Sequence, residues 1–488
     1  MKKIIILFIW SIGILSCTSD FEELNKDPLA ANEVPTPTLL TKAMQDLIGI
    51  NSGIGLNKTF MMYSQQWAQR ETTTRSLYGI TSTSGYWRSW YLNGMPELIE
   101  IIKLNSEDEK EKYAVYGKNE NQIAVAKILK AWAFHNITDI WGNVPYSETY
   151  IFDISKPKYD KQSDIYLALI SELKEAADMI DVSASGFTSG DLMYAGDMNK
   201  WLSFANSLRA RIALRMSEVN PSLAKIEVAD ALGSTVFSGN IDNAQISFQT
   251  EEAYANPLYL EFLTQSWTFV SEPMIDLMNS YGSGTVTIPS DPRIIKYAAP
   301  NEDGDYFGFP YGLTTSESID NYTITERSLP SEEVRAIDFP SYIMTYSELL
   351  FIKAEAEQRG WFGAVGDAST TYNQSITASM EQWNVTSADV ATYLALPDVQ
   401  YNAVNWRKMI GEQKYISLYM QGVNAWSEWR RLDFPVLAFP VAASSNATEI
   451  PRRFFYSSRE SIVNTQSLNQ AINDMGGDTF STRMWWDQ

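Results

Sequence analysis

Few residues in this 488-residue chain could take part in nucleophilic or metal-assisted catalysis. The chain contains one histidine, His135, and one cysteine, Cys17, which the N-terminal pattern described below assigns to lipidation. A Cys/His pair or a multi-histidine zinc site is therefore unavailable, and a Ser/His/Asp triad would have to use His135. That histidine follows Phe134 inside a helical pattern, where we expect it to be buried or at an interface. These residues predict a protein that is not an enzyme.

Paired carboxylates are the other chemistry that the composition allows. Two of them about 5 to 10 Å apart can hydrolyse a glycoside, but no compact motif singles out two of the 59 Asp and Glu residues. The acidic turn at residues 301–308 (NEDGDYFG) resembles a calcium loop, although it lacks the D-x-D-x-D-G spacing and the later glutamate. We therefore predict no metal site and no cofactor. Calcium stays an unsupported alternative, and a surface glycoside hydrolase stays an alternative function.

Two long stretches combine aromatic rings with polar side chains: residues 65–91 and residues 247–340. A sugar ring has a partly apolar C–H face and a rim of hydroxyls, which flat rings and Asn, Gln, Asp or Arg side chains can bind. Most of the 15 Trp, 26 Tyr and 21 Phe must nevertheless be core, and Met61 and Met62 suggest helix packing for Trp67. The ligand-binding residues that we predict are Trp67, Arg70, Arg75, Tyr78, Trp267, Tyr306 and Tyr311.

The N-terminus has the pattern of an export signal. Lys2 and Lys3 precede an apolar run that is too short to span a bilayer comfortably, and the run ends at Cys17. Residues 14–17 (ILSC) resemble a bacterial lipobox, in which the cysteine is acylated and becomes the new N-terminus. The pattern predicts a signal peptide over residues 1–16 and a mature chain held through lipid at Cys17. An ordinary secretory signal with an incidental cysteine is the alternative.

Charge and hydropathy exclude two classes of partner. The chain has 38 Lys and Arg against 59 Asp and Glu, a formal net charge of −21. Nucleic-acid binding requires clustered basic residues, so we expect none. Beyond the signal there is no apolar run of about eighteen residues. We therefore expect attachment to a membrane through the lipid only.

Helical patterns dominate the elements that would position the two aromatic stretches. In residues 121–140 apolar side chains recur three and four positions apart, and Gly142 and Pro145 then end the pattern. The same spacing predicts helices over residues 163–180, 199–217, 342–359, 372–383 and 406–426. Paired helices without alternating strands predict a mainly α fold. The pairs resemble tetratricopeptide units, although no strict 34-residue period is present.

Three conspicuous motifs have a structural interpretation. In WGNVPYSE, from Trp141, the rings flanking Gly and Pro are suited to packing a helix end. In NSLRARIALR, Arg209 and Arg215 can cover apolar surface with their stems while their heads bind acidic partners. In GVNAWSEWRR, Arg430 and Arg431 can pair with nearby carboxylates or stack on a ring. We therefore leave all three motifs out of the predicted binding site.

Several motifs also occur in a characteristic order along the chain. They are FEELNKDP near the lipobox, WGNVPYSE, NSLRARIALRMS, DPRI, IMTYSELLFIKAEAEQRGW, IGEQKYISLYMQGVNAWSEWRRLDFP, and IPRRFFYSSRESIVN with GGD and WWD. Together with the lipobox, this order resembles the SusD/RagB family of surface nutrient-binding lipoproteins, over nearly the whole mature chain.

The resemblance implies a SusD-like fold in a single domain over residues 17–488. A helical scaffold would occupy about 37–240 and 341–430, and a loop-rich ligand-binding part about 241–340 and 431–488. It also implies an outer-membrane, surface-exposed protein that captures an oligosaccharide and delivers it to a SusC-like TonB-dependent transporter. Capture of peptides or another nutrient is the alternative, because family membership indicates delivery and leaves the cargo open.

Overall fold

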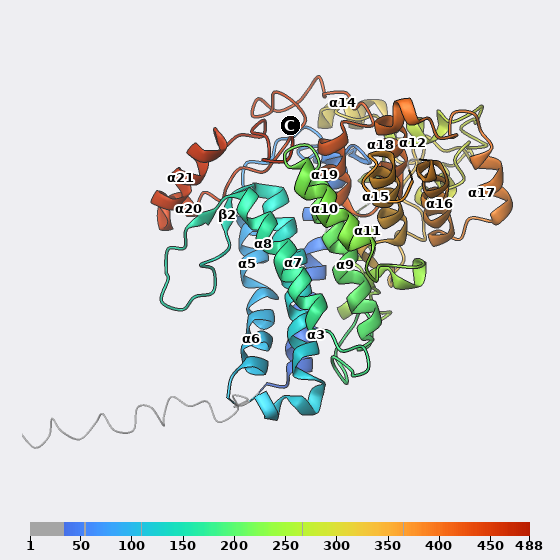
Figure 1. Ribbon diagram of the computed structural model, residues 1–488. Helices are drawn as coiled ribbons and strands as arrows, with labels where there is room; N and C mark the ends of the chain where they lie inside the picture. Colours follow the sequence, from blue (N-terminus) through green and yellow to red (C-terminus); the bar gives the residue numbers. More distant parts are fainter. Residues whose placement is uncertain (1–33, 53–54, 109, 266, 365) are drawn as a thin grey trace, which may run out of the picture.

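Figure 1 shows the fold in a computed structural model that describes residues 34–52, 55–108, 110–265, 267–364 and 366–488. Helices form most of the described chain, and its strands form three two-stranded antiparallel ribbons. This arrangement confirms the predicted mainly α fold. Residues 1–16 and Cys17, to which the sequence assigns export and lipidation, lie outside the described residues. The division into one domain with a scaffold and a loop-rich part stays a prediction.

The longer helices belong to two stretches of the chain. Those before residue 240 are α3 (Thr36–Ser52), α4 (Leu56–Tyr63), α5 (Ser84–Leu92), α6 (Met95–Ser106), α7 (Asn119–Trp141), α8 (Gln162–Met179), α9 (Met198–Arg215) and α10 (Pro221–Leu232). Those after residue 340 are α15 (Tyr346–Gln358), α16 (Asp367–Gln382), α17 (Ser387–Leu394), α18 (Trp406–Ser417), α19 (Gly422–Leu432) and α21 (Thr465–Met475). Shorter helices are α11 (Pro257–Phe262), α12 (Glu272–Asn279), α13 (Ile294–Tyr297), α14 (Thr315–Asn321) and α20 (Glu460–Val463).

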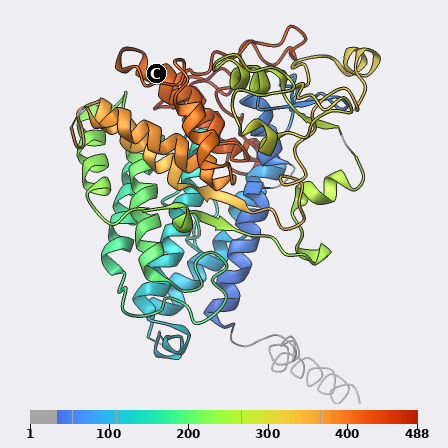
Figure 2. The same ribbon diagram turned by 90° about the vertical axis from the view of Figure 1, so that its right-hand side faces the viewer.

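Two of the three ribbons join segments that are far apart in the sequence. Strand β1 (Trp67–Gln69) pairs with β5 (Thr268–Val270), β2 (Val144–Pro145) with β3 (Tyr159–Asp160), and β4 (Ala244–Ile246) with β6 (Ser341–Met344). In Figure 2 the β4–β6 ribbon lies beside α3. The β1–β5 and β4–β6 ribbons therefore attach the central loop-rich segment to the rest of the chain.

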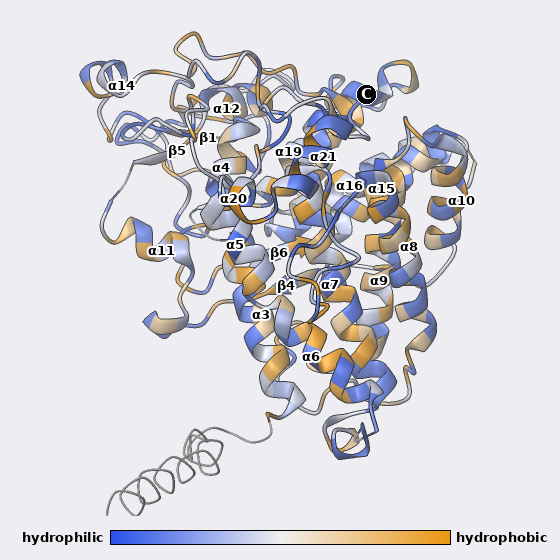
Figure 3. Ribbon diagram, turned by 90° about the vertical axis from the view of Figure 1, so that its left-hand side faces the viewer, coloured by the Kyte–Doolittle hydropathy of each residue, from blue (hydrophilic) through white to orange (hydrophobic). Residues whose placement is uncertain are grey.

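Consecutive helices of the scaffold pack against one another as hairpins. Helices α6 to α10 form a continuous series of such neighbours, and α15 packs on α16 (Figure 1). Their ends are defined locally: the Asp197 side chain accepts hydrogen bonds from the first backbone N–H groups of α9, and Gly142, at φ 86°, ends α7. Figure 3 shows apolar and polar residues alternating along these helices, which is the amphipathic pattern that hairpin packing requires.

Two of the predicted helices differ from the structure. Residues 342–344 of the predicted helix over 342–359 lie in β6, and the Thr345 side chain then caps α15 by accepting from Glu348 N. The pattern over 406–426 is divided between α18 and α19 at residues 418–421. At this division the backbone N–H of Gly422 donates to Asn57 Oδ1 at 2.7 Å. Contacts with β4 and α4, which no local pattern shows, override the helical pattern at these two places.

The core is divided between two large clusters of buried side chains. One fills the helical hairpins from α3 to α9 and extends to α19, and the other lies between α15–α18 and the segment 258–342. None of the helices in the described part of the chain combines the length and the apolar character that a bilayer crossing requires.

Candidate functional site

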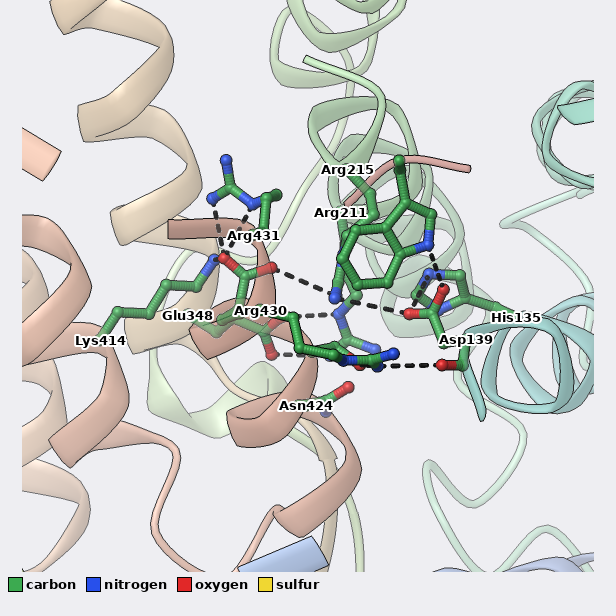
Figure 4. Close-up of polar contacts among 12 residues, drawn as sticks. His135, Asp139, Arg211, Arg215, Glu348, Lys414, Asn424, Arg430 and Arg431 are labelled. Atoms are coloured by element: carbon green, nitrogen blue, oxygen red, sulfur yellow. Dashed lines mark hydrogen bonds and ion pairs between the residues drawn. The ribbon is translucent and has the colours of Figure 1, made fainter. Parts of the chain in front are cut away.

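A group of charged side chains is buried where α9, α15 and α19 meet (Figure 4). Arg211 donates through Nε and Nη2 to the two carboxylate oxygens of Glu348, each at 2.6 Å. Arg431 binds Glu355 in the same two-pronged way, at 2.7 and 2.6 Å, and also binds Glu428. Such pairs neutralise each other and fix the relative position of helices. Because the group is closed to solvent, we assign it to the scaffold.

His135 belongs to the same buried region. Its Nε2 lies 3.4 Å from Oδ2 of Asp139, and the hydroxyl of Tyr166 and Nε1 of Trp486 donate to the other oxygen of this carboxylate. Burial, opposed by Asp139 and assisted by Arg215, lowers the pKa of His135 to about 3. Within the described residues neither ring nitrogen has a hydrogen-bond partner. The histidine is buried, as predicted, and without contact to solvent it cannot serve as a general base.

The three motifs that we interpreted as structural are part of the core. Trp141 and Trp426 are buried, and the guanidinium carbon of Arg430 lies 3.5 Å from the centre of a Trp426 ring. Arg209 pairs with Asp230, and Arg215 lies 3.5 Å from a carboxylate oxygen of Asp139. The structural interpretation of these residues is confirmed.

The two aromatic-rich stretches of the sequence meet at the β1–β5 ribbon. The ladder continues beyond the strands, since the backbone N–H of Arg70 donates to the carbonyl oxygen of Trp267 at 3.0 Å. Nε of Arg70 donates to the carbonyl oxygen of Tyr322 at 2.9 Å, and the Ser318 hydroxyl donates to the carbonyl of Arg70 at 2.6 Å. Segments about 200 and 250 residues apart are therefore held side by side at one end of this ribbon.

Aromatic and charged side chains gather around this end of the ribbon. The guanidinium carbon of Arg327 lies 4.8 Å from the ring centre of Tyr322 and 5.7 Å from that of Phe307. Phe307 is 36% exposed, and Tyr322 is half-buried. Such stacking of a guanidinium on rings holds the ring planes in place. We call this surface the β1–β5 rim and define it by Arg70, Glu71, Trp267, Phe307, Tyr322 and Arg327.

Two carboxyl groups lie next to the rim on α12. Glu272 and Asp276 are one helical turn apart, and the backbone N–H of Glu272 donates to the carbonyl of Phe309 at 2.8 Å. Burial raises the pKa of both groups, while Asp276 adds to the rise at Glu272 and Arg327 opposes it. These carboxyls can accept hydrogen bonds from ligand hydroxyls, and they are a pair that a hydrolase at this surface could use.

Two of the predicted ligand-binding residues are in the core. Trp67 is 1% exposed and its Nε1 donates to the Tyr419 hydroxyl at 2.9 Å, and Tyr78 is 0% exposed with its hydroxyl bound by Gln65. A sugar needs an accessible ring face for stacking, and neither residue has one. The structure therefore removes Trp67 and Tyr78 from the candidate site. Met61 and Met62, beside Trp67 in the sequence, also lie in the core.

Two further predicted residues donate hydrogen bonds to α4 through their polar groups. The Tyr311 hydroxyl donates to the Met62 carbonyl at 2.6 Å, and Nε of Arg75 donates to the Thr59 hydroxyl at 3.0 Å. Both side chains are half-buried. These contacts leave their polar ends bound within the protein, beside the rim.

The remaining three predicted residues lie at or near the surface of the rim. Arg70 and Trp267 are neighbours across the extended ladder, and Tyr306 is half-buried immediately before Phe307. Their role in binding stays a prediction. Sequence reasoning did not select Tyr322 and Arg327, because only the chain path after α14 brings them to Arg70 and no local pattern marks them.

No group of three or more His, Cys, Asp or Glu side chains that could hold a metal ion is found among the residues that the structure describes. The acidic turn at 301–305 is closed by the side chain of Asn301, whose Oδ1 accepts from the backbone N–H groups of Asp303 and Asp305 at 3.0 and 2.8 Å.

The helical fold with its loop-rich segment is that of a known protein family. A model of the SusD-like family, described as starch-binding and associating with the outer membrane, matches residues 28–457, so the chain belongs to this family. Among curated proteins no match is found.

Solved structures show the same fold. A chitin-binding protein is 26% identical with a TM-score of 0.79, and the match covers 93% of this chain and 99% of that chain. A chitin-binding SusD homologue from Flavobacterium johnsoniae is 24% identical with a TM-score of 0.77, covering 92% and 98%. A SusD homologue from Parabacteroides distasonis is 24% identical with a TM-score of 0.80, covering 93% and 98%. The predicted family and fold are confirmed.

Proposed function

We propose that this protein is a non-catalytic surface lipoprotein that binds an oligosaccharide at the β1–β5 rim. It then delivers the oligosaccharide to a SusC-like TonB-dependent transporter of the outer membrane. The observation that carries the binding role is the convergence of two aromatic-rich segments into one surface with accessible rings and charged groups. The description of the family and the chitin-binding titles of two structural relatives support a glycan as the cargo.

The rim offers both parts of what a sugar needs. The rings of Phe307 and Trp267 would contact the C–H faces, while the guanidinium of Arg70 and the carboxylate of Glu71, 2.7 Å apart, would bind hydroxyls. Because Arg327 stacks on Phe307, the ring is held in place before the ligand arrives and little ordering is required on binding. A surface with few rings binds reversibly, which suits a protein that must release its cargo.

Titration calorimetry of the protein against chitooligosaccharides, maltooligosaccharides and peptides tests this proposal, with product formation measured in the same samples. We expect saturable binding of a glycan without product. Release of product would establish an enzyme and direct attention to Glu272 and Asp276, and saturation by peptides alone would replace the glycan with a peptide cargo.

Replacement of the exposed rim ring tests the position of the site. Phe307→Ala should weaken glycan binding by about 1 kcal/mol, or roughly fivefold, since one ring–sugar contact is lost. Its melting temperature should change little, because the side chain is 36% exposed. Phe152→Ala is the matched control, because this ring is fully exposed in the loop between β2 and β3, which contributes no residue to the rim. Equal affinities for all three proteins would show that the rim is not the site.

Delivery to a transporter rests on family membership. Purification of the native protein from outer membranes tests it, and we expect a large TonB-dependent barrel to be present in the purified sample. Repeated recovery of the protein without any such barrel, in mild detergent and with ligand added, would contradict the delivery role.

A further inference from the structure

A cleft of about 760 Å³ lies apart from the rim, between α3, the chain that leads into α9, and strand β4. It shares no lining residue with the rim, and in Figure 3 its strand β4 lies well below β1 and β5. Gln45 and Ile48 contribute from α3, Tyr194 from the loop before α9, and Gln245 from β4. Sites for small ligands are usually clefts of roughly 300 to 1,000 Å³, and this cleft falls in that range.

The lining is almost free of charge, although the chain as a whole has a formal net charge of −21. Lys200 is the one charged side chain among the lining residues. Its Nζ already donates to the carbonyl oxygen of Ile241 at 3.0 Å, and it lies 5.9 Å from the ring centre of Tyr194. An anionic ligand would therefore meet a single cation that has its own partners, so the cleft is suited to an uncharged ligand.

Carboxamide groups supply most of the hydrogen-bonding capacity of the cleft. The side chains of Gln45, Gln245 and Gln249 have no hydrogen-bond partner among the described residues. Each carboxamide has two N–H donors and one carbonyl acceptor, whereas a sugar hydroxyl both donates and accepts one or more hydrogen bonds. A purely apolar ligand would leave these groups unpaired, which disfavours it.

Aromatic rings form the flat walls of the cleft. Tyr254 is 53% exposed, and Phe248 is half-buried. The ring of Tyr194 is only 6% exposed and forms the back of the cleft, where its hydroxyl donates to the carbonyl of Asp242 at 2.8 Å. A short turn holds the backbone of Tyr254 in place, because Gln249 N donates to its carbonyl oxygen at 3.0 Å. The accessible rings of Tyr254 and Phe248 can contact the C–H face of a sugar.

We propose that this cleft is a second binding site, one that takes an uncharged oligosaccharide. The assignment combines three observations: a cleft of suitable volume, unpaired carboxamides on facing elements, and accessible rings without unpaired charge. The choice of a sugar rests on the proposed function, whereas the neutrality of the ligand rests on the lining itself. The two sites differ in chemistry, because the rim carries Arg70, Glu71 and Arg327.

Calorimetric titration of the full chain, in a detergent without sugar head groups, tests this site with chitohexaose and maltoheptaose as probes. The cleft variant is Gln45→Ala/Tyr254→Ala, the rim variant is Phe307→Ala, and Phe152→Ala is the control. For at least one probe we expect the wild-type protein to bind two molecules. The cleft variant should lose one of them or bind it at least tenfold more weakly, while the rim variant keeps that binding event.

The outcomes separate the cleft from the rim. If Phe307→Ala weakens glycan binding and the cleft variant binds as the wild-type protein does, the second site is overturned and the proposed function stays intact. Binding that responds only to the cleft variant would support the cleft and contradict the rim. Absence of binding to every neutral probe would contradict both the rim and the cleft. If the anionic oligogalacturonate binds in the cleft as strongly as the neutral probes, the preference of the cleft for an uncharged ligand would be contradicted. Gln249→Ala, also exposed, repeats the test should Gln45→Ala/Tyr254→Ala melt early.

Discussion

His135 and Asp139 lie one helical turn apart on α7, with Nε2 of the histidine 3.4 Å from Oδ2 of the aspartate. The histidine is neutral in the folded protein, because burial lowers its pKa to about 3, against an ordinary value of 6.5. In the unfolded chain it takes up a proton as the pH falls below 6.5. The folded state therefore loses stability progressively as the pH falls from 6.5 towards 3.

This linkage predicts the pH dependence of folding. Between pH 7 and pH 5 the free energy of unfolding should fall by about 2 kcal/mol through His135 alone, since one pKa unit corresponds to about 1.4 kcal/mol. In His135→Gln the same interval should show a smaller loss. Denaturant unfolding of both proteins at the two pH values measures the difference. Parallel losses in the two proteins would show that this histidine does not titrate between the folded and unfolded states.

Helix α19 is tied to α15 by the pair formed between Arg431 and Glu355. Burial alone would raise the pKa of Glu355, but Arg431 and Arg359 outweigh it and lower this pKa to about 2. Both partners are buried, so removing one leaves a charge without compensation. The position of α19 relative to the other helices thus depends on groups that the sequence places more than seventy residues apart.

Arg431→Met should lower the free energy of unfolding by about 3 to 5 kcal/mol. Arg407→Met is the matched control, because Arg407 pairs with Glu218 where both side chains are partly exposed, at 40% and 29%. An exposed pair of this kind contributes about 1 kcal/mol or less. Denaturant unfolding compares the two variants, and similar losses would contradict a special role for the buried pair.

The break between α18 and α19 also depends on a contact between two elements. A Cβ atom at Gly422 would lie 2.5 Å from the backbone oxygen of Asn57 in α4. Gly422→Ala should therefore destabilise the protein by about 2 kcal/mol, through displacement of α4 from α19. Gly49→Ala in α3 meets no atom within 4 Å and should stabilise the protein by about 0.5 to 1 kcal/mol through helix propensity. Thermal melting of both variants checks the opposite signs, and a stabilised Gly422→Ala would refute the close approach.

At the scale of the whole molecule, the β4–β6 ribbon joins the two ends of the loop-rich segment 247–340, and the β1–β5 ribbon attaches it at residues 268–270. The rim and the cleft lie at these two attachments, so both proposed sites include short paired strands. A site placed at such an attachment keeps its geometry while the loops around it vary. We expect relatives with the same fold to differ in cargo mainly through these segments.

Attachment of the molecule to the outer membrane depends on Cys17 in our proposal. Cys17→Ala should move the protein from the membrane fraction to the soluble fraction, because several acyl chains together supply firm anchoring. Thr18→Ala is the control and should stay in the membrane fraction. Mass spectrometry of the N-terminal peptide measures acylation directly. An N-terminal peptide that extends upstream of Cys17, or one without added lipid mass, would contradict the lipoprotein proposal.

A comparison of Trp67 with Trp267 shows how much of the candidate site could be predicted from the sequence. Both are tryptophans in aromatic-rich stretches, and the sequence provides no difference that decides between them beyond the methionines near Trp67. The structure buries Trp67 against Tyr419 and leaves Trp267 half-buried at the rim. The contact partner of Trp67 lies 352 residues away, and such a distance cannot be inferred from a local pattern.

The sequence by itself determined helices α7, α8, α9 and α16, the burial of His135, and the family, because helical periodicity and ordered motifs are local properties of the chain. Only the tertiary structure decided which rings are accessible, that Tyr322 and Arg327 join Arg70, and that residues 341–344 form a strand. These features depend on burial and pairing between distant segments. The free energy that favours this burial and pairing comes from contacts across the whole folded chain. No short stretch of sequence therefore specifies these features.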